Sequence, residues 1–330
     1  MPNIKSLIDS IFSIENDNSF NSIAIEVFQY QYKYNHVYSQ YVNYLNIDVK
    51  KIDHYLKIPF LPIEFFKTHQ VSTGDIIPSV TFTSSGTTGS NVSRHAVADL
   101  SIYEKSFTKG FNMFFGDPSD YVFLALLPSY LEREGSSLIY MAEKLIKSSS
   151  HSESGFYLNE YNQLSKLLLK LKAENKKTIL LGVTYALLNL IEQYPIDFPE
   201  LIVMETGGMK GKRKELVREE LHARLISSFG VNKIYSEYGM TELLSQAYSK
   251  GEGQFMTPPW MKAIIRDTND PFSLLSTDKT GGVNIIDLAN INSCSFIETK
   301  DLGKTHSNGS FEILGRFDNS DIRGCNLLIE

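Results

Sequence analysis

Short apolar segments alternate with amphipathic segments between residues 121 and 242, and this alternation restricts the fold more than any other feature. Apolar runs of strand length occur in YVFLALLPS, TILLGVTY and LIVMETGG, which begin at Tyr121, Thr178 and Leu201. The segments between them carry apolar residues at helical spacing, as in YNQLSKLLLKLKAENK. Continuous apolar runs are typical of strands covered on both faces. The alternation therefore predicts an α/β fold with mostly parallel sheets flanked by helices.

Both ends of the chain differ from this central pattern. Residues 1–56 are rich in Tyr and Phe at spacings of three and four, which predicts a helical N-terminal region packed on the main domain. The main domain is expected to span residues 57–330. From about residue 255 to 330 the helical pattern fades, and GGVNIIDLA, SCSFIETKDLG and GSFEILGR predict short strands joined by turns. The main domain should thus end in a β-rich part.

Composition and charge argue against several classes of protein. The 330 residues are 42% hydrophobic and 21% charged, which is usual for a folded protein. A net charge of −6 without a basic block argues against a dedicated nucleic-acid-binding protein. No run approaches the ~18 apolar residues of a membrane span. The two cysteines, Cys294 and Cys325, are too few for a secreted disulfide framework. We therefore expect a cytoplasmic protein that neither spans a membrane nor binds nucleic acid.

A loop rich in serine, threonine and glycine follows the expected strand SVTFTSS. The segment SSGTTG consists of Ser84, Ser85, Gly86, Thr87, Thr88 and Gly89. Hydroxyls and the backbone amides of glycines are donors that bind phosphate, and a strand before and a helix after would aim them at one point. A nucleotide P-loop is excluded, because Ser90 stands where that motif needs lysine. Composition alone leaves a solvated surface loop equally open.

The segment YSEYGMTE carries a second set of candidate site residues. Gly239 permits a sharp turn after Tyr238. Thr241 and Glu242 then present oxygen atoms of the kind that bind Mg²⁺ together with substrate phosphates. The alternative is an ordinary helix N-terminus, in which Thr241 caps the helix and Glu242 favours its dipole.

Three further segments are weaker candidates. In METGG, Gly207 and Gly208 follow an expected strand and would let a flat ligand approach the backbone, or form an ordinary turn. In ETKDLG, Asp301 is expected at a strand end, where it could accept hydrogen bonds from a ribose or lie in a surface turn. In GRFDNSDIRGC, Arg316 lies in a polar turn that is either functional or a solvated hairpin.

The order of these five segments resembles the adenylate-forming superfamily, which includes acyl- and aryl-CoA ligases, nonribosomal adenylation domains and luciferase. The resemblance covers residues 80–325. Such enzymes activate a carboxylate with ATP, release pyrophosphate and pass the acyl group to a nucleophile, usually a thiol. The resemblance implies an AMP-binding domain over residues 57–330 that uses ATP and Mg²⁺.

The same resemblance implies a role for each segment. The SSGTTG loop would surround the β- and γ-phosphates, Thr241 would contact the α-phosphate, and Glu242 would hold Mg²⁺. The residues implied for the adenosine are Gly207, Gly208, Tyr238, Gly239, Asp301 and Arg316. Among these, Tyr238 would stack on adenine and Asp301 would bind the ribose hydroxyls.

The chain departs from the superfamily pattern in three places. A lysine usually follows the phosphate loop, whereas here Arg94 and His95 are the first basic residues and become catalytic candidates. The hinge motif is altered to GRFDNSDIRG. In the superfamily that hinge opens a C-terminal lid domain of ~100 residues with a catalytic lysine. Because the sequence ends at Glu330, we expect a fold without this lid, and ordinary CoA ligation is in doubt.

A short branch, the acyl-protein synthetases (LuxE-type), matches these departures. The sequences SRH at Ser93–His95, TELLSQAY and TPPWMKAIIRD are similar to that branch. It implies that a fatty acid, by default long-chain, moves from the adenylate to a cysteine near the C-terminus, here Cys325, and then to an acyl-CoA reductase-type partner. Cys294 is expected to be structural. Two alternatives stay open: transfer to CoA or a carrier-protein thiol, as in phenylacetate-CoA ligases, and an adenylate-binding protein without catalysis.

Overall fold

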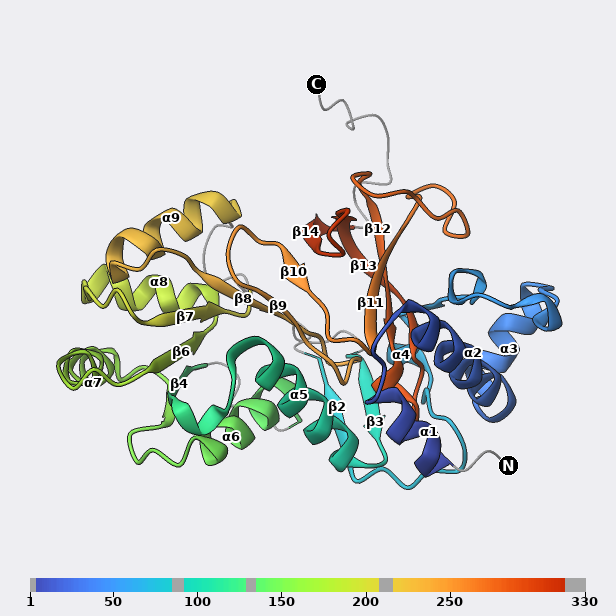
Figure 1. Cartoon of the computed structure of the whole chain (residues 1–330), viewed down its shortest axis with the longest axis horizontal. Helices are drawn as coiled ribbons and strands as arrows, with labels where there is room; N and C mark the ends of the chain where they lie inside the picture. Colours follow the sequence, from blue (N-terminus) through green and yellow to red (C-terminus); the bar gives the residue numbers. More distant parts are fainter. Residues whose placement is uncertain (1–3, 85–91, 129–134, 208–215, 318–330) are drawn as a thin grey trace.

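The alternating segments form one end of a large mixed sheet (Figure 1). The structure, a computed structural model, describes residues 4–84, 92–128, 135–207 and 216–317. The parallel strands are β4 (Val122–Leu126), β6 (Thr178–Gly182), β7 (Ile202–Glu205) and β8 (Tyr235–Tyr238). Every residue of β4 and β6 is buried, as their continuous apolar runs predict. The predicted α/β class is thus confirmed.

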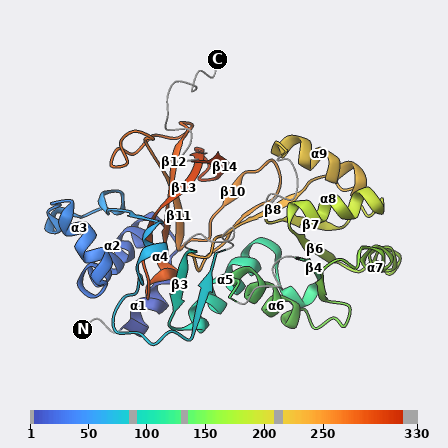
Figure 2. The ribbon, with the colours of Figure 1, turned by 180° about the vertical axis from the view of Figure 1, so that it is seen from behind.

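Helices cover both faces of these parallel strands. They are α5 (Leu100–Phe115), α6 (Ser137–Ser149), α7 (Tyr161–Ala173), α8 (Thr184–Gln193) and α9 (Arg218–Phe229). In both views, α8 and α9 lie on one side of the strands and α5 and α6 on the other (Figures 1 and 2). The edge strand β5 (Gly155–Tyr157) was not predicted, because three residues are too few to show a pattern.

The β-rich end continues the same sheet in antiparallel fashion. Its strands are β9 (Ala247–Ser249), β10 (Phe255–Met256), β11 (Met261–Arg266), β12 (Gly281–Asp287), β13 (Phe296–Thr305) and β14 (Phe311–Arg316). The strand order is β11-β12-β13-β14-β10-β9-β8-β7-β6-β4-β5. The predicted β-rich end is therefore present, and its strands meet the parallel ones at β8 and β9. Residues far apart in sequence are brought together at this junction.

The expected N-terminal helices are present and pack on the β-rich end. They are α1 (Ile4–Ile11), α2 (Asp17–Tyr34) and α3 (His36–Tyr44). In Figure 2, α2 lies between α3 and β11. Gln31 is buried on α2, and its amide donates to the carbonyls of Asn290 and Ile291 at 3.1 and 3.0 Å. The boundary near residue 56 stays a prediction. In the described part of the chain, no helix is long and apolar enough to cross a membrane.

The strands before and after the SSGTTG segment pair with each other, which corrects one expectation. Strands β2 (Val80–Thr83) and β3 (Arg94–Val97) form an antiparallel two-stranded sheet of their own. The loop was expected between a strand and a helix, yet β3 follows it and α5 begins only at Leu100. The sequence did not predict β3, because its first two residues, Arg94 and His95, were assigned to the loop. Two further short elements are β1 (Leu61–Pro62) and α4 (Phe65–Thr68).

Candidate functional site

Tyr238, Asp301 and Arg316 meet where β8, β13 and β14 come together. The Tyr238 hydroxyl donates to Oδ2 of Asp301 at 2.8 Å, and Nε of Arg316 lies 3.3 Å from Oδ1. The antiparallel register places Asp301 directly opposite Arg316. Burial raises the pKa of Asp301, although the hydrogen bond from Tyr238 and the charge of Arg316 oppose that shift. The sequence-predicted trio is thus one connected group.

Two details of this group differ from the sequence expectations. Asp301 was expected at a strand end, but it lies inside β13 and is only 7% exposed. A register shift between Leu302 and Gly303 follows it directly. Arg316 is the last residue of β14 and its side chain is 74% exposed, so it borders solvent. A buried acceptor beside an exposed cation is suited to a polar ligand that enters from solvent.

Gly207 lies beside this group, at the adjoining strand end. The register pairs Glu205 with Ser236, so Gly207 and Tyr238 each stand two residues beyond a paired position. Gly207 has a φ of +70°, a conformation that favours glycine. Its amide donates to the Glu205 carboxylate at 2.6 Å. Loops at adjoining carboxyl ends of parallel strands are where α/β sheets bind ligands.

Glu205 was not predicted, although it fixes the turn at Gly207. It is buried, and Thr184 also donates to it at 3.3 Å. Burial by itself would raise its pKa, but interactions with His222, Ser236 and the Gly207 amide outweigh burial and leave the pKa below its ordinary value. The feature of the sequence that could have indicated Glu205 is a single carboxylate within an otherwise apolar strand segment. By contrast, burial and the nearby Glu205 charge raise the pKa of Glu237 to about 8.

Thr241 and Glu242 lie in a turn between β8 and β9, so the alternative of a helix N-terminus is wrong. The Thr241 carbonyl accepts a hydrogen bond from Nδ1 of His95 at 2.8 Å. The Glu242 carbonyl accepts one from the Asn290 amide at 2.7 Å. Two buried side chains from distant parts of the chain therefore fix the backbone of this turn.

Asp287 holds the next two residues of the same segment. One of its carboxylate oxygens accepts from the amides of Leu244 and Ser245, at 2.8 and 2.9 Å, and the other accepts from the Ser245 hydroxyl at 2.6 Å. Asp287 is fully buried, and burial raises its pKa to about 6 against the opposing effect of these donors. Neither Asp287 nor Asn290 was predicted. The feature of the sequence that could have indicated them is that both are polar residues within an apolar segment.

Arg94 and His95 point to opposite faces of the hairpin. Cross-strand pairing places Arg94 beside Thr83 and His95 beside Phe82. His95 is 1% exposed and contacts the ring of Phe66 edge-on, and burial lowers its pKa to about 4. His95 is therefore a neutral, buried side chain that positions Thr241, whereas Arg94 is exposed. A direct catalytic contact of His95 with a ligand stays untested, but its buried position favours a positioning role.

Glu242 has the surroundings of a single carboxylate ligand. It is 5% exposed, and burial raises its pKa, although Ser93 and the charges of Arg316 and Lys67 oppose the shift. Within the described ranges, no group of three or more His, Cys, Asp or Glu side chains could hold a metal ion. A single carboxylate fits Mg²⁺ that takes its other ligands from water and substrate phosphates. The residues present are thus compatible with the expected Mg²⁺.

Several predicted site residues lie outside the described residues. These are Ser85, Gly86, Thr87, Thr88, Gly89, Gly208 and Cys325. Ser84 is described, and its hydroxyl accepts a hydrogen bond from the Ser93 amide at 3.0 Å across the base of the loop. Gly239 is exposed beside Tyr238. Cys294 is fully buried with its pKa raised to about 12 by burial, which fits the expected structural role.

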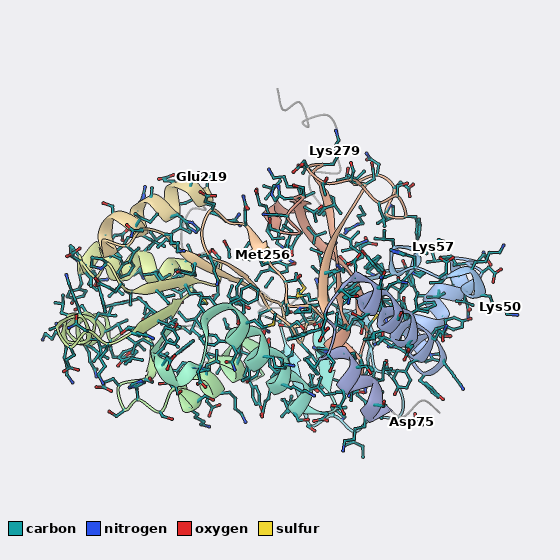
Figure 3. The ribbon with its side chains drawn as sticks, viewed as in Figure 1. Lys50, Lys57, Asp75, Glu219, Met256 and Lys279 are labelled. Atoms are coloured by element: carbon teal, nitrogen blue, oxygen red, sulfur yellow. The ribbon has the colours of Figure 1, made fainter. Side chains whose placement is uncertain are left out.

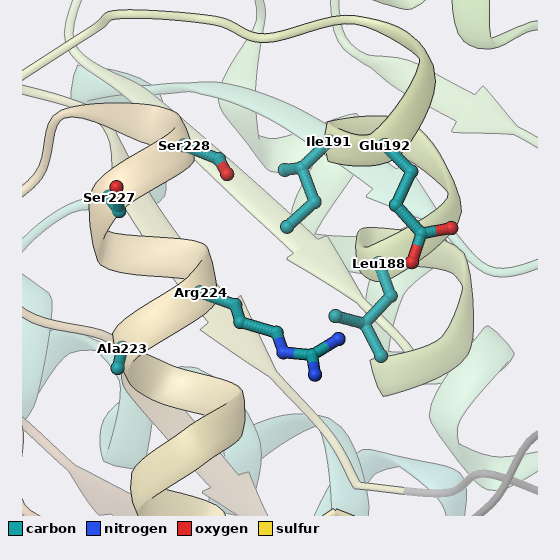
Figure 4. A pocket seen from close by; sticks show the side chains of 7 residues that line it. All are labelled: Leu188, Ile191, Glu192, Ala223, Arg224, Ser227 and Ser228. Carbon is teal, nitrogen blue, oxygen red and sulfur yellow. The ribbon is translucent and has the colours of Figure 1, made fainter.

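A cavity of about 490 Å³ lies away from all these residues, between α8 and α9. Figure 4 shows the Arg224 side chain extending from α9 toward Leu188 on α8. The cavity is lined by apolar and polar side chains that belong only to these two helices. It contains none of the candidate site residues.

No protein-family model matches the sequence, and no curated protein matches it. Solved structures do share its fold. 2-Hydroxyisobutyryl-CoA ligase in the postadenylation state, in complex with 2-HIB-AMP, superposes with a TM-score of 0.69 at 12% identity over 92% of this chain and 68% of that chain. The same ligase with 2-HIB-AMP and CoA in the thioesterification state gives 0.66 at 14% identity, over 97% of this chain and 70% of that one.

A second ligase gives the same result over a shorter stretch. ATP-bound MatB from Rhodopseudomonas palustris matches with a TM-score of 0.54 at 17% identity, covering 72% of this chain. The chain thus spans about 70% of 2-hydroxyisobutyryl-CoA ligase and 47% of MatB. At these identities the likeness is one of fold, and the chain has the α/β fold of adenylate-forming ligases.

Proposed function

We propose that this protein activates a carboxylic acid with ATP to an acyl-adenylate, with release of pyrophosphate. The observation that carries the proposal is the connected group of Tyr238, Asp301 and Arg316 beside the turn of Thr241 and Glu242. The charge of Arg316 acts on both Asp301 and Glu242, so the two parts are close enough to serve one ligand. The shared fold with ligases solved with AMP esters and ATP supports the same proposal.

In the proposed first step, a carboxylate oxygen attacks the α-phosphorus of ATP and the bond to the leaving pyrophosphate breaks. Asp301 orients the ribose through its free lone pairs, since each carboxylate oxygen has two. The Thr241 hydroxyl donates to an α-phosphate oxygen, and Glu242 holds Mg²⁺. When bound, Mg²⁺ supplies positive charge that offsets the charge of the phosphates. The buried side chains of His95, Asn290 and Asp287 keep this turn in place before the ligand binds.

In the proposed second step, a thiolate attacks the acyl carbon, a C–S bond forms, and AMP leaves with the oxygen to which the acyl group was joined. We propose Cys325 as the thiol, a long-chain fatty acid as the substrate, and an acyl-CoA reductase-type protein as the later acceptor, all in the cytoplasm. These assignments rest on the acyl-protein synthetase resemblance. A CoA acceptor is the second candidate, favoured by the CoA bound in 2-hydroxyisobutyryl-CoA ligase.

Pyrophosphate exchange tests the first step. The full-length protein, supplied with Mg²⁺ and a panel of carboxylic acids, should incorporate labelled pyrophosphate into ATP only when a substrate acid is present. Glu242→Gln keeps the side-chain volume and removes the charge, so exchange should fall ~100-fold. Glu219→Gln, on the exposed first turn of α9 (Figure 3), is the matched control and should exchange normally. Undiminished exchange in Glu242→Gln would show that Glu242 does not hold the metal.

Acyl labelling tests the second step and separates the acceptors. With ATP and labelled fatty acid, protein-bound label that hydroxylamine releases and that Cys325→Ala abolishes would identify Cys325. The control is Cys294→Ala, which removes a buried thiol and should label normally. Label that passes to CoA while the protein stays unlabelled would favour the second candidate. Acid-independent binding of AMP without any exchange would favour the non-catalytic alternative.

A further inference from the structure

A second cavity, of about 480 Å³, lies between α4 and the hairpin of β2 and β3. Its polar lining includes Lys67, His69, Thr81, Thr83 and Arg94. No carboxylate is among the described residues that line it. The whole chain carries a net charge of −6, so a cavity whose described lining has two permanent cations and no carboxylate is a local exception. Such a lining is suited to an anionic ligand.

The hairpin register explains why polar groups gather on this side. Thr81 pairs with Ala96, and Thr83 pairs with Arg94, so these four side chains share one face of the hairpin. The opposite face carries Phe82 and His95, which are buried in the core. Successive side chains of a strand point to opposite faces. Because His95 points into the core, its neighbour Arg94 points to the other face, where the cavity lies.

The position of Lys67 is fixed by the residues around it. The preceding strand β1 pairs in parallel with β13, and the Ile63 amide donates to the Glu298 carbonyl at 3.0 Å. Phe66 is 1% exposed, and its ring meets that of His95 at a centroid distance of 5.7 Å. The buried Phe66 therefore anchors α4 to the hairpin. Lys67 is the next residue, and its exposed side chain lines the cavity.

The cavity adjoins the candidate site. Thr83 and Arg94 stand immediately before and after the segment that runs from Ser84 to Ser93. The charge of Lys67 also acts on Glu242. Among the described residues, neither the Lys67 ammonium nor the Arg94 guanidinium makes a hydrogen bond or an ion pair. The described lining therefore offers both cations to a ligand that reaches from Glu242 into the cavity.

We propose that this cavity binds a polyphosphate, namely the terminal phosphates of ATP and the pyrophosphate released from it, through Lys67 and Arg94. The inference rests on the proposed function, because only adenylate formation supplies such a leaving group at Glu242. It also accounts for the absent lysine after Gly89: two cations from α4 and β3 stand near the end of the loop instead. The threonine hydroxyls add neutral donors.

Direct binding of inorganic pyrophosphate to the full chain, measured by titration calorimetry in magnesium buffer, tests the proposal. Charge-assisted hydrogen bonds are strong, so Lys67→Ala and Arg94→Ala should each raise the Kd for pyrophosphate ~10-fold, and the double variant more. Lys67→Arg, which keeps the charge, should bind nearly as wild type. Lys50→Ala, at the far edge of the molecule (Figure 3), is the matched control and should have no effect. AMP lacks the terminal phosphates, so its affinity should not change.

The same variants distinguish the proposal from its alternatives. In exchange assays, Lys67→Ala should raise the KM for pyrophosphate more than it lowers kcat. If wild-type protein exchanges normally while Lys67→Ala and Arg94→Ala bind pyrophosphate unchanged, the cavity assignment is wrong and the proposed function stands. If Lys67→Ala weakens CoA more than dephospho-CoA and leaves pyrophosphate unaffected, the cavity takes the phosphates of CoA and the proposal is overturned. If pyrophosphate binding depends on both cations but no acid supports exchange, the proposed function fails instead.

Discussion

Asp287→Asn should remove the loss of stability that burial of this carboxylate causes as the pH rises from 4 to 6, while it weakens the candidate site. Burial raises the pKa of Asp287 from 3.8 to about 6. Above pH 6 the folded chain holds a buried carboxylate whose ionisation is less favourable than in the unfolded chain. At about 1.4 kcal/mol per pKa unit, this difference corresponds to about 3 kcal/mol. Asparagine has a similar volume and does not ionise, so the variant lacks this penalty.

The sign of the pH dependence follows from proton binding. Between pH 4 and 6 the folded chain keeps a proton on Asp287 that the unfolded chain has lost, so the wild-type free energy of unfolding falls as pH rises through this window. Urea unfolding of both proteins from pH 3.5 to 7 should show the variant gaining about 3 kcal/mol relative to wild type. Asp75→Asn, an exposed carboxylate (Figure 3), is the control.

Activity should fall in the same variant. In the variant an amide NH₂ replaces one carboxylate oxygen and faces the amides of Leu244 and Ser245 as another donor. The turn of Thr241 and Glu242 should lose part of its support, and exchange should fall about tenfold. Parallel unfolding curves across pH would refute the reasoning, because they would mean that the four donors to Asp287 fully offset its burial. A variant that is less stable at pH 7 than at pH 4, relative to wild type, would contradict the sign.

Three further variants test single contacts. Tyr238→Phe removes the hydrogen bond to Asp301, so the KM for ATP should rise about tenfold. The pKa of Asp301 should rise further without this bond, so the acidic limb of the kcat/KM profile should move to higher pH. Burial lowers the pKa of His95 from 6.5 to about 4, so the wild-type protein should lose about 3 kcal/mol of stability as the pH falls from 6.5 to 4. Thermal unfolding should show a smaller loss in His95→Gln. Cys294→Ala, at a fully buried position, should lower the free energy of unfolding in urea by about 1 kcal/mol and leave exchange unchanged.

The apolar periodicity was sufficient for most of the fold. Strands such as Val122–Leu126 and helices such as Tyr161–Ala173 agree with their predicted segments, because local hydrophobic patterns decide which faces are buried. Two short strands, Gly155–Tyr157 and Arg94–Val97, were not predicted. Each pairs with the strand that precedes it in the chain, but patterns of three and four residues are too short to specify that pairing.

The sequence by itself determined the types of side chain at the site and their order along the chain. Tyr238, Asp301 and Arg316 were named from motifs alone. Only the tertiary structure decided that a hydrogen bond and an ion pair join them, because β13 must pair with β14 in register and the sheet must bring β8 close to both. It also placed His95 in the core and Lys67 beside Arg94 in one cavity. Such contacts depend on strand register and packing, and neighbouring residues along the chain do not specify either.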